Sequence, residues 1–323
     1  MSRGRETGVA VQQFVHKVRG AVETVIVGKP DTIETVVATL LCGGHVLFED
    51  YPGLGKTLLA RTLAGALNLD FKRIQFTPDL LPGDITGGYI YNRDSATFEL
   101  RRGPVFTNIL LADEINRASP KTQSALLEAM QEGQVTIEGE SLPLPQPFVV
   151  LATQNPIEYE GTFPLPEAQL DRFLVKLSIG YPDPDAEVEI LRRRRERKSD
   201  ATSVNAVTDQ NELLGVQELV EEIFLHEDLE RYIVDIVGRT RGHTNVSVGA
   251  SPRGSLAIMK LARAIAAASG RGFVIPDDVK QTAVPALRHR LVLAPDLWMR
   301  ADAAEEVIES ILNLVPVPVV EGA

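Results

Sequence analysis

The segment from Val46 to Ala64 constrains this chain most, because a short glycine-rich loop there joins an apolar run to a helical one. Val46-Leu47-Phe48 predicts a buried strand, and Leu58 to Ala64 is rich in residues that favour helices. In this context, the backbone N–H groups of the loop and the positive end of the helix converge on phosphate. The sequence therefore predicts a nucleoside triphosphate site at residues Asp50, Tyr51, Pro52, Gly53, Leu54, Gly55, Lys56, Thr57 and Leu58.

Three residues of this loop have individual expectations. Lys56 is expected to reach the β- and γ-phosphates, and the Thr57 hydroxyl to hold Mg²⁺. Asp50 stands where the usual motif has its first glycine. Aspartate tolerates a left-handed backbone better than most residues, so the turn survives, and we expect the carboxylate to point away from the phosphates. The alternative is a turn that only resembles the motif, and the strand and helix on either side argue against it.

Composition narrows the class of protein. The 323 residues suggest about two domains. There are 33 basic and 44 acidic residues, a net charge of −11, which gives no general attraction to nucleic acid or anionic lipid. The single cysteine, Cys42, excludes an internal disulfide. With no apolar secretory segment at the N-terminus and no membrane-spanning stretch, we expect a cytoplasmic protein.

The pattern of strands and helices predicts an α/β fold. Between residues 11 and 180, short apolar runs alternate with helical ones, which indicates a three-layer domain with a parallel sheet. The runs 108–112 and 148–152 are nearly all apolar, as central strands covered on both faces are. After Tyr181-Pro182 helical periodicity dominates, so we predict a nucleotide-binding core over 1–181 and a small, mostly helical domain over 182–323. The expected helix N-caps are Asp31, Asp185 and Ser251.

Polar side chains end two of these strands. Asp113 and Glu114 directly follow the run 108–112, and in a parallel sheet they would face the phosphate loop. Asp113 would hold the hydrated Mg²⁺, and Glu114 would polarise the attacking water. Asn155 ends the next strand, where an amide would bond a γ-phosphate oxygen and the water. Asn155 before a proline also suits an ordinary turn, and the surrounding residues argue for the phosphate role.

Several long strings resemble the MoxR family of AAA+ ATPases. The resemblance covers nearly the whole chain and is strongest from Val27 to Ile179. It implies a P-loop core with a helical lid, bound ATP and Mg²⁺, and ATP hydrolysis. The strings that carry it are residues 110–118, 121–132, 152–156, 158, 160–162 and 164–173.

The resemblance also implies a role for each matching residue. Lys56 and Thr57 match the first Walker motif, Asp113 and Glu114 the second, Asn155 sensor 1, Arg172 the arginine finger that reaches a neighbouring subunit's nucleotide, Arg253 sensor 2 in the lid, and Val27 and Gly28 the adenine pocket. The alternatives are a salt bridge between Arg172 and an acid such as Asp171, and a solvated Arg253. Whether Arg253 serves its own or a neighbouring site stays open.

Two insertions read as hairpins. Residues 88–91 and 96–100 flank the turn 92–95, and residues 133–140 form the second hairpin. They resemble the helix-2 insert and the pre-sensor hairpin of the AAA+ clade that contains MoxR proteins, chelatase motor subunits and replicative helicases. In that clade they project toward the pore of a ring. The alternative is a pair of ordinary surface hairpins.

The leading hypothesis is an ATPase ring, expected to be a hexamer, that remodels or matures a client protein in chaperone fashion. The resemblance further implies a partner with a von Willebrand A-type domain. A nucleic-acid motor is one alternative, but the hairpin at 132–140 carries Glu138 and Glu140 and no base, which disfavours phosphate contacts. Arg93, Arg101 and Arg102 leave that reading some room. A metal-chelatase motor subunit is the other alternative.

Overall fold

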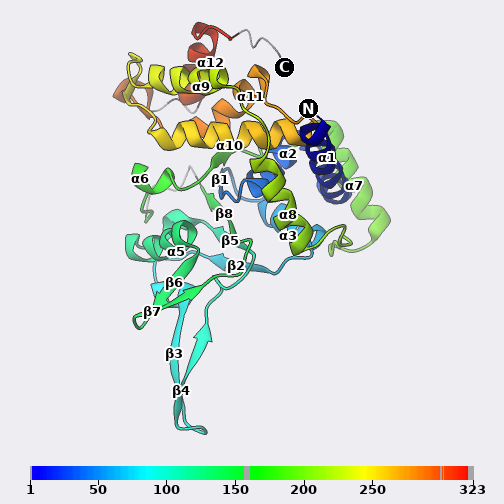
Figure 1. The fold of residues 1–323 in the computed structure, drawn as a ribbon. Helices are drawn as coiled ribbons and strands as arrows, with labels where there is room; N and C mark the ends of the chain where they lie inside the picture. The colour runs from blue at the N-terminus through cyan, green and yellow to red at the C-terminus, as the bar shows by residue number, and fades with distance from the viewer. Residues whose placement is uncertain (1, 156–160, 299, 301, 319–323) are drawn as a thin grey trace.

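A parallel sheet of five strands forms the centre of the molecule (Figure 1). The structure is a computed structural model that describes residues 2–155, 161–298, 300 and 302–318. The sheet order is β2-β5-β8-β1-β9, and each neighbouring pair is parallel, which confirms the predicted α/β class. The carboxyl ends of the strands therefore meet at one edge. The strands are β1 (Val46–Glu49), β2 (Phe71–Gln75), β5 (Ile109–Asp113), β8 (Val149–Gln154) and β9 (Val175–Leu177).

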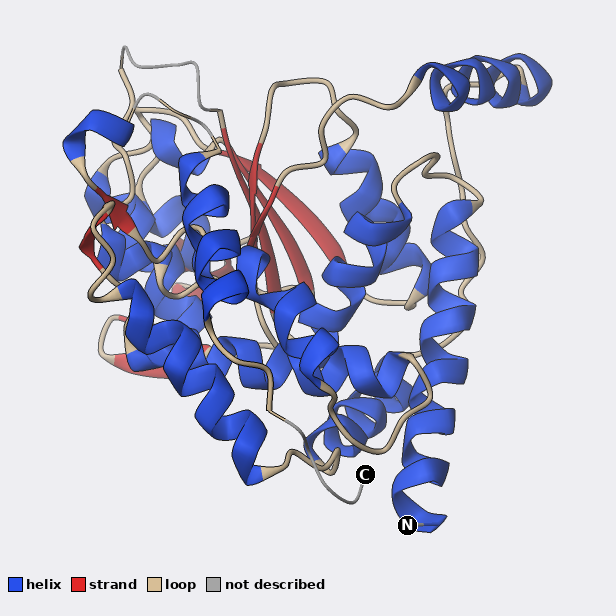
Figure 2. Cartoon of the chain, turned by 90° about the horizontal axis from the view of Figure 1, so that it is seen from above, coloured by secondary structure: helices blue, strands red, loops and turns tan. Residues whose placement is uncertain are grey.

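Helices cover both faces of the sheet, which explains why the central strands are apolar throughout. Along β8, Val149 and Leu151 join one buried cluster, whereas Val150 and Ala152 join a second cluster on the other face. The first cluster includes side chains of α1 (Ser2–Glu23), α2 (Pro30–Leu41) and α3 (Lys56–Ala66), and the second includes those of α5 (Pro120–Glu132). Figure 2 shows helices on both sides of the strands.

The C-terminal part is mostly helical and lies against the core. Its long helix α10 (Pro252–Ala268) packs on α1, α9 and α11, so the N-terminal helix is in contact with the C-terminal helices. One apolar cluster runs through both parts of the chain. The division at residues 181 and 182 stays a prediction. The remaining elements of this part are α7 (Pro184–Arg197), α8 (Gln210–Glu221), α9 (Glu227–Thr240), β10 (Val246–Val248), α11 (Pro276–Leu287), β11 (Val292–Leu293) and α12 (Ala303–Leu314).

Two of the three predicted N-caps are wrong, and proline explains both. α2 begins at Pro30, so Asp31 lies inside its first turn. α7 begins at Pro184, and the carboxylate of Asp183 accepts the backbone N–H of Ala186 at 2.7 Å. Proline fits the first helical position because it has no N–H to satisfy and its φ is already helical, so each helix starts earlier than the acidic residue suggested. Ser251 caps α10 as predicted.

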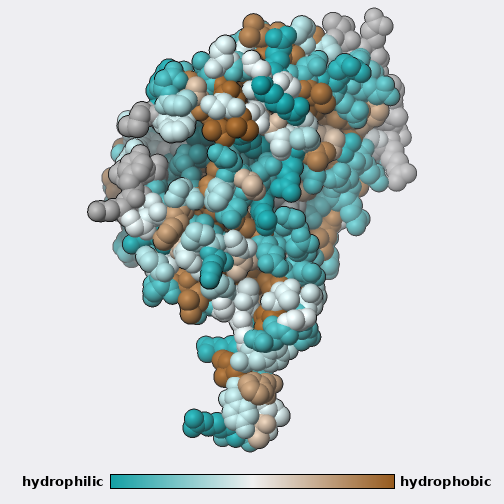
Figure 3. Space-filling view, turned by 90° about the vertical axis from the view of Figure 1, so that its left-hand side faces the viewer, coloured by the Kyte–Doolittle hydropathy of each residue, from teal (hydrophilic) through white to brown (hydrophobic). Residues whose placement is uncertain are grey.

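Both predicted hairpins are present. The first, β3 (Gly87–Asn92) with β4 (Thr97–Arg102), follows the short helix α4 (Pro82–Thr86) and extends from the body as a narrow arm (Figures 1 and 3). A Cβ on Gly87 would lie 2.1 Å from the Arg101 carbonyl oxygen, so the base of the arm requires glycine. The second hairpin pairs β6 (Gln134–Ile137) with β7 (Glu140–Pro143). The Tyr89 hydroxyl donates to the Glu140 carboxylate at 2.7 Å and joins the two hairpins.

Within the described residues, the structure contains no helix of the length and apolarity needed to cross a membrane.

Candidate active site

The phosphate loop, the carboxylates after β5 and the amide after β8 line one cavity of about 380 Å³ at the carboxyl edge of the sheet. The structure thus brings together most of the predicted phosphate and metal residues. The predicted adenine-pocket residues and the two predicted arginines lie elsewhere. The lining residues are Asp50, Pro52, Gly53, Leu54, Gly55, Lys56, Thr57, Leu58, Arg73, Gln75, Asp113, Glu114, Thr153, Gln154 and Asn155.

The loop has the backbone of an anion site. Gly53 and Gly55 have φ of 85° and 84°, a left-handed conformation that directs successive N–H groups to one side. Lys56 begins α3, and its ammonium donates to the carbonyl oxygens of Asp50 at 2.9 Å and Tyr51 at 3.0 Å. Burial lowers the pKa of Lys56, and the nearby carboxylates oppose that shift. The ammonium is therefore folded over its own loop, within the cavity that phosphate would enter.

Asp50 lines the cavity with its backbone, and its carboxylate faces away, as expected. The Ser178 hydroxyl donates to its Oδ1 at 2.7 Å, and the backbone N–H groups of Ile179 and Gly180 donate at 2.5 and 3.2 Å. The side chain is only 5 % exposed. Asp50 therefore fastens the phosphate loop to the segment after β9, and only its carbonyl oxygen faces Lys56.

The two carboxylates after β5 each have polar partners. Asp113 accepts the Thr153 hydroxyl at 2.6 Å on Oδ1 and the Arg73 guanidinium at 2.6 Å on Oδ2. Glu114 accepts the Gln75 amide at 2.8 Å and pairs with Arg117 at 3.2 Å. These contacts fix the orientation of both carboxylates before any ligand binds.

Arg73, Gln75 and Thr153 are site residues that the sequence analysis missed. Arg73 and Gln75 alternate on β2, and Gln75 lies beside Asp113 in the register of the sheet. The sequence shows two long polar side chains at the end of this strand, but it does not show that the strand lies beside β5, where they meet the terminal acids. Thr153 lies near the carboxyl end of β8, the strand on the other side of β5.

Thr57 and Asp113 suit a magnesium ion bound together with a nucleotide. Both line the phosphate cavity and supply oxygen ligands. Mg²⁺ in such sites keeps several waters and phosphate oxygens, so it needs only one or two protein ligands. Within the described residues there is no cluster of three or more acidic, histidine or cysteine ligands.

A second cavity of about 650 Å³ adjoins the first, because Pro52, Gly53, Leu54, Gly55 and Leu58 line both. Its other walls are largely apolar, as a nucleoside base requires. Val27, which we expect in the adenine pocket, lines this cavity together with Ile26, Leu59, Ile179, Tyr181 and Ile190.

Two of the predicted binding residues line neither cavity. Gly28 turns the chain with φ of 73°, and a Cβ there would lie 2.7 Å from Ala186 at the start of α7. The Tyr51 ring is exposed and lies 6.2 Å from the Tyr181 ring. Gly28 therefore allows the chain to turn close to α7 without lining the cavity. Tyr51 contributes its carbonyl oxygen, which accepts from Lys56.

Arg172 and Arg253 lie apart from the phosphate cavity and share a third hollow of about 270 Å³. Lys260 and Arg290 also line it, with Asp171 as the acid among them. Arg172 donates to the Leu127 carbonyl oxygen at 2.5 Å, whereas Asp171 pairs with Arg290 at 2.7 Å and with Arg253 at 3.9 Å. With four cations and one carboxylate, this hollow is suited to an anion. The segment 156–160, which carries part of the family resemblance, lies outside the described residues.

Comparison with known proteins identifies the family of this chain. Residues 45–175 match the family described as "ATPase family associated with various cellular activities (AAA)", and residues 238–311 match the AAA lid domain. Chaperone MoxR1 of Mycobacterium tuberculosis is 45% identical over 99% of this chain and 86% of its own length. Uncharacterized protein YeaC of Bacillus subtilis is 49% identical, over 98% of this chain and 99% of its own length.

The fold has a close counterpart among solved structures. A crystal structure assigned as an ATPase of Cytophaga hutchinsonii is 40% identical, with a TM-score of 0.90 over 98% of this chain and 99% of that one. Protein MoxR of Paracoccus denitrificans is 30% identical over 92% of this chain and 94% of its own length. The chain belongs to the MoxR family of AAA+ ATPases and is an ATP hydrolase.

Proposed function

We propose that this chain hydrolyses Mg²⁺–ATP at sites shared between neighbouring subunits of a ring, and that hydrolysis drives the remodelling or maturation of a client protein. One observation carries the shared site: Arg172 and Arg253 line a basic hollow of their own, while the phosphate cavity contains Lys56, Asp113 and Glu114. A second subunit would bring the hollow of one chain to the nucleotide of the next.

The residues of the phosphate cavity divide the chemistry among them. The loop N–H groups and Lys56 would bind the phosphates, and Thr57 and Asp113 would hold Mg²⁺, which supplies neutralisation of the phosphate charge. Glu114 would orient and polarise the water, with Asn155 bonding the water and a γ-phosphate oxygen. Gln75 and Arg117 hold the Glu114 carboxylate in place, so little reorganisation is needed when the water binds.

The basic hollow of a neighbouring subunit would supply the remaining positive charge at the nucleotide. Negative charge spreads over the γ-phosphoryl oxygens during transfer, and a guanidinium placed there stabilises it. Because Arg253 contacts Asp171, the residue before Arg172, we propose that Arg253 acts on the same neighbouring nucleotide as Arg172. The sequence left open which site Arg253 serves, and this contact favours the neighbouring one.

The relatives also bear on the client and the assembly of this chain. The name Chaperone MoxR1, of a relative that is 45% identical, supports client remodelling. We propose a hexameric, cytoplasmic ring with a von Willebrand A-type partner. A chelatase motor is the second candidate, since a protein named as a magnesium-chelatase subunit ChlI homolog, from Methanocaldococcus jannaschii, is 30% identical over 64% of this chain and 55% of its own length.

The shared site is tested by two substitutions with opposite expectations for binding and turnover. Glu114→Gln should bind ATP and lose turnover, because the water loses its carboxylate. Arg172→Ala should lose turnover by about 10³-fold while its own cavity still binds ATP, since an arginine finger is worth 10³–10⁵ in rate. The measurements are steady-state ATP hydrolysis and equilibrium binding of a fluorescent ATP analogue.

Arg231→Ala is the matched control, because Arg231 is an exposed arginine on α9. It should hydrolyse ATP like the unmodified protein. Wild-type turnover in Arg172→Ala would overturn the shared site.

A further inference from the structure

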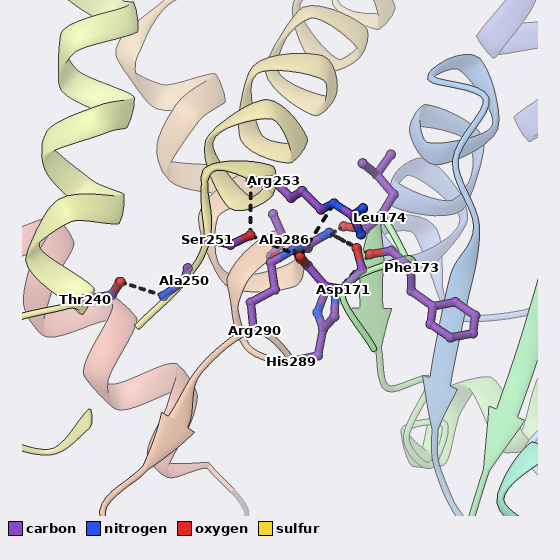
Figure 4. A network of polar contacts seen from close by, with 10 residues as sticks. All are labelled: Asp171, Phe173, Leu174, Thr240, Ala250, Ser251, Arg253, Ala286, His289 and Arg290. Carbon is purple, nitrogen blue, oxygen red and sulfur yellow. Dashed lines mark hydrogen bonds and ion pairs between the residues drawn. The ribbon is translucent and has the colours of Figure 1, made fainter. Parts of the chain in front are cut away.

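The four-residue link that carries Arg172 is fastened to the lid. Residues 171–174 connect α6 (Glu167–Leu170) to β9. The Asp171 carboxylate accepts Arg290 Nε at 2.7 Å and the Ser251 hydroxyl at 3.0 Å, and Arg253 lies 3.9 Å away (Figure 4). Ser251 and Arg253 belong to the start of α10, and Arg290 follows the end of α11. Asp171 therefore connects the lid to the residue next to Arg172.

Arg290 is the principal group of this connection. Its guanidinium also donates to the carbonyl oxygens of Phe173 at 2.7 Å, Leu174 at 3.1 Å and Asp171 at 3.3 Å, and to that of Ala286 in its own helix. The side chain is 3 % exposed. Burial lowers the pKa of Arg290, and Asp171 opposes that shift. A buried arginine that contacts three of the four residues of the link holds the link to α11 as one unit.

Two further contacts hold the link, one from the lid and one from the sheet. The His289 ring donates to the Phe173 carbonyl oxygen at 3.0 Å, and Leu174 N–H donates to the His45 carbonyl oxygen at 2.9 Å. Arg172 itself extends into the hollow, where its side chain contacts the Leu127 carbonyl oxygen. The backbone on both sides of Arg172 is therefore fixed by lid and sheet. Figure 4 shows Arg290 and His289 beside Asp171, Phe173 and Leu174 of the link.

We propose that Asp171 and Arg290 are positioning residues for Arg172, and that they transmit movement of the lid to it. This inference rests on the proposed shared site. Displacement of a catalytic group by about 1 Å costs on the order of 10²-fold in rate. The donors of the guanidinium form a fixed planar fork, so Arg290 holds several carbonyl oxygens at once, which lysine does not reproduce.

A fastener that only stabilises the subunit would give a different result. Loss of such a contact would impair two sites equally. These are the subunit's own nucleotide site and the neighbouring site to which the subunit presents Arg172. Positioning of Arg172 impairs only the neighbour's site. Mixed rings separate the two, because a Glu114→Gln subunit presents Arg172 without hydrolysing ATP, and an Arg172→Ala subunit keeps its own catalytic carboxylate without presenting the arginine.

The experiment mixes these two subunits and measures recovered ATP turnover. Arg290→Gln is added first to the Glu114→Gln subunit and then, separately, to the Arg172→Ala subunit. We expect recovery to fall at least tenfold in the first mixture and less than twofold in the second. Arg290→Lys in the Glu114→Gln subunit should give the same low recovery of ATP turnover. Arg288→Gln is the control, since Arg288 lies two residues away and pairs with Glu305, outside the hollow; it should leave both mixtures unchanged.

Each other outcome has a definite meaning. The positioning role is overturned if Arg290→Gln leaves ATP turnover unchanged in both mixtures, or lowers it equally in both. No recovery in the parent mixture, without any change at Arg290, contradicts the shared site instead. If thermal unfolding shows that Arg290→Gln does not fold, Asp171→Asn replaces it, because it keeps the shape and removes the charge. The same asymmetry is expected there, and its absence overturns the inference.

Discussion

At the scale of single residues, Asp50 shows how a departure from a motif is accommodated. The carboxylate takes three donors from residues 178–180, so it fastens the loop where a glycine would only permit the turn. The sequence indicated that this carboxylate points away, because a negative charge beside triphosphate is unfavourable. It did not indicate what the carboxylate binds, since residues 178–180 are distant in the chain.

Asp50→Ala tests this anchor. The substitution leaves the buried N–H of Ile179 and the half-buried N–H of Gly180 without an acceptor, and an unpaired buried group costs about 1–3 kcal/mol. We expect the free energy of unfolding to fall by about 2 kcal/mol or more and ATP affinity to weaken. Urea unfolding and ATP titration measure the two effects.

Asp50→Asn is the matched variant, because it keeps an acceptor oxygen of the same shape. Its loss should be smaller. An unchanged urea midpoint in Asp50→Ala would contradict the anchoring role.

The residues that were predicted and those that were missed differ in a physical way. Lys56, Thr57, Asp113 and Glu114 lie in contiguous segments whose local pattern predicts their chemistry. Arg73, Gln75 and Thr153 act only through neighbouring strands, and the strand order β2-β5-β8 that brings them beside Asp113 and Glu114 is not written in any local pattern.

At the scale of elements, β9 connects two sites with one short strand. Arg172 lies just before it, and residues 178–180, which hold Asp50, lie just after it. Within the same strand, Lys176 pairs with Glu49 at 2.5 Å, next to the phosphate loop. The phosphate loop and the arginine that would face the neighbour are thus both in contact with, or adjacent to, β9. The sequence identified Arg172 and Asp50, but it predicted neither this strand nor the residues after it that hold Asp50.

The arm formed by β3 and β4 contributes little to the core. Tyr91 and Phe98 pack edge to face on each other at 5.4 Å and are 52 % and 69 % exposed. Because exposed side chains away from the core contribute little to stability, Tyr91→Ser with Phe98→Ser should leave the thermal midpoint within about 3 °C and ATP turnover within twofold.

Ile85→Ala provides the contrast for that experiment. Ile85 is fully buried in α4 at the base of the arm, so its truncation should cost about 2–5 kcal/mol. A large loss of basal turnover in the arm variant would show that the arm takes part in the catalytic site, contrary to its position outside the phosphate cavity.

At the scale of the whole molecule, the separation of two sets of charged residues is the central feature. One chain places its carboxylates and Lys56 in the phosphate cavity and places Arg172 with Arg253 in a different hollow. Motifs identified each residue, yet the sequence does not say which cavity each one enters. That depends on how α10 and α11 pack against the link 171–174.

The most direct test is ATP turnover per subunit measured across protein concentration, with molecular mass determined by light scattering in the same solutions. If the site is shared, diluted monomers hydrolyse almost no ATP, and turnover per subunit rises in step with the oligomer. Arg172→Ala oligomers of the same mass stay inactive. Full turnover by a monomer would contradict the shared site.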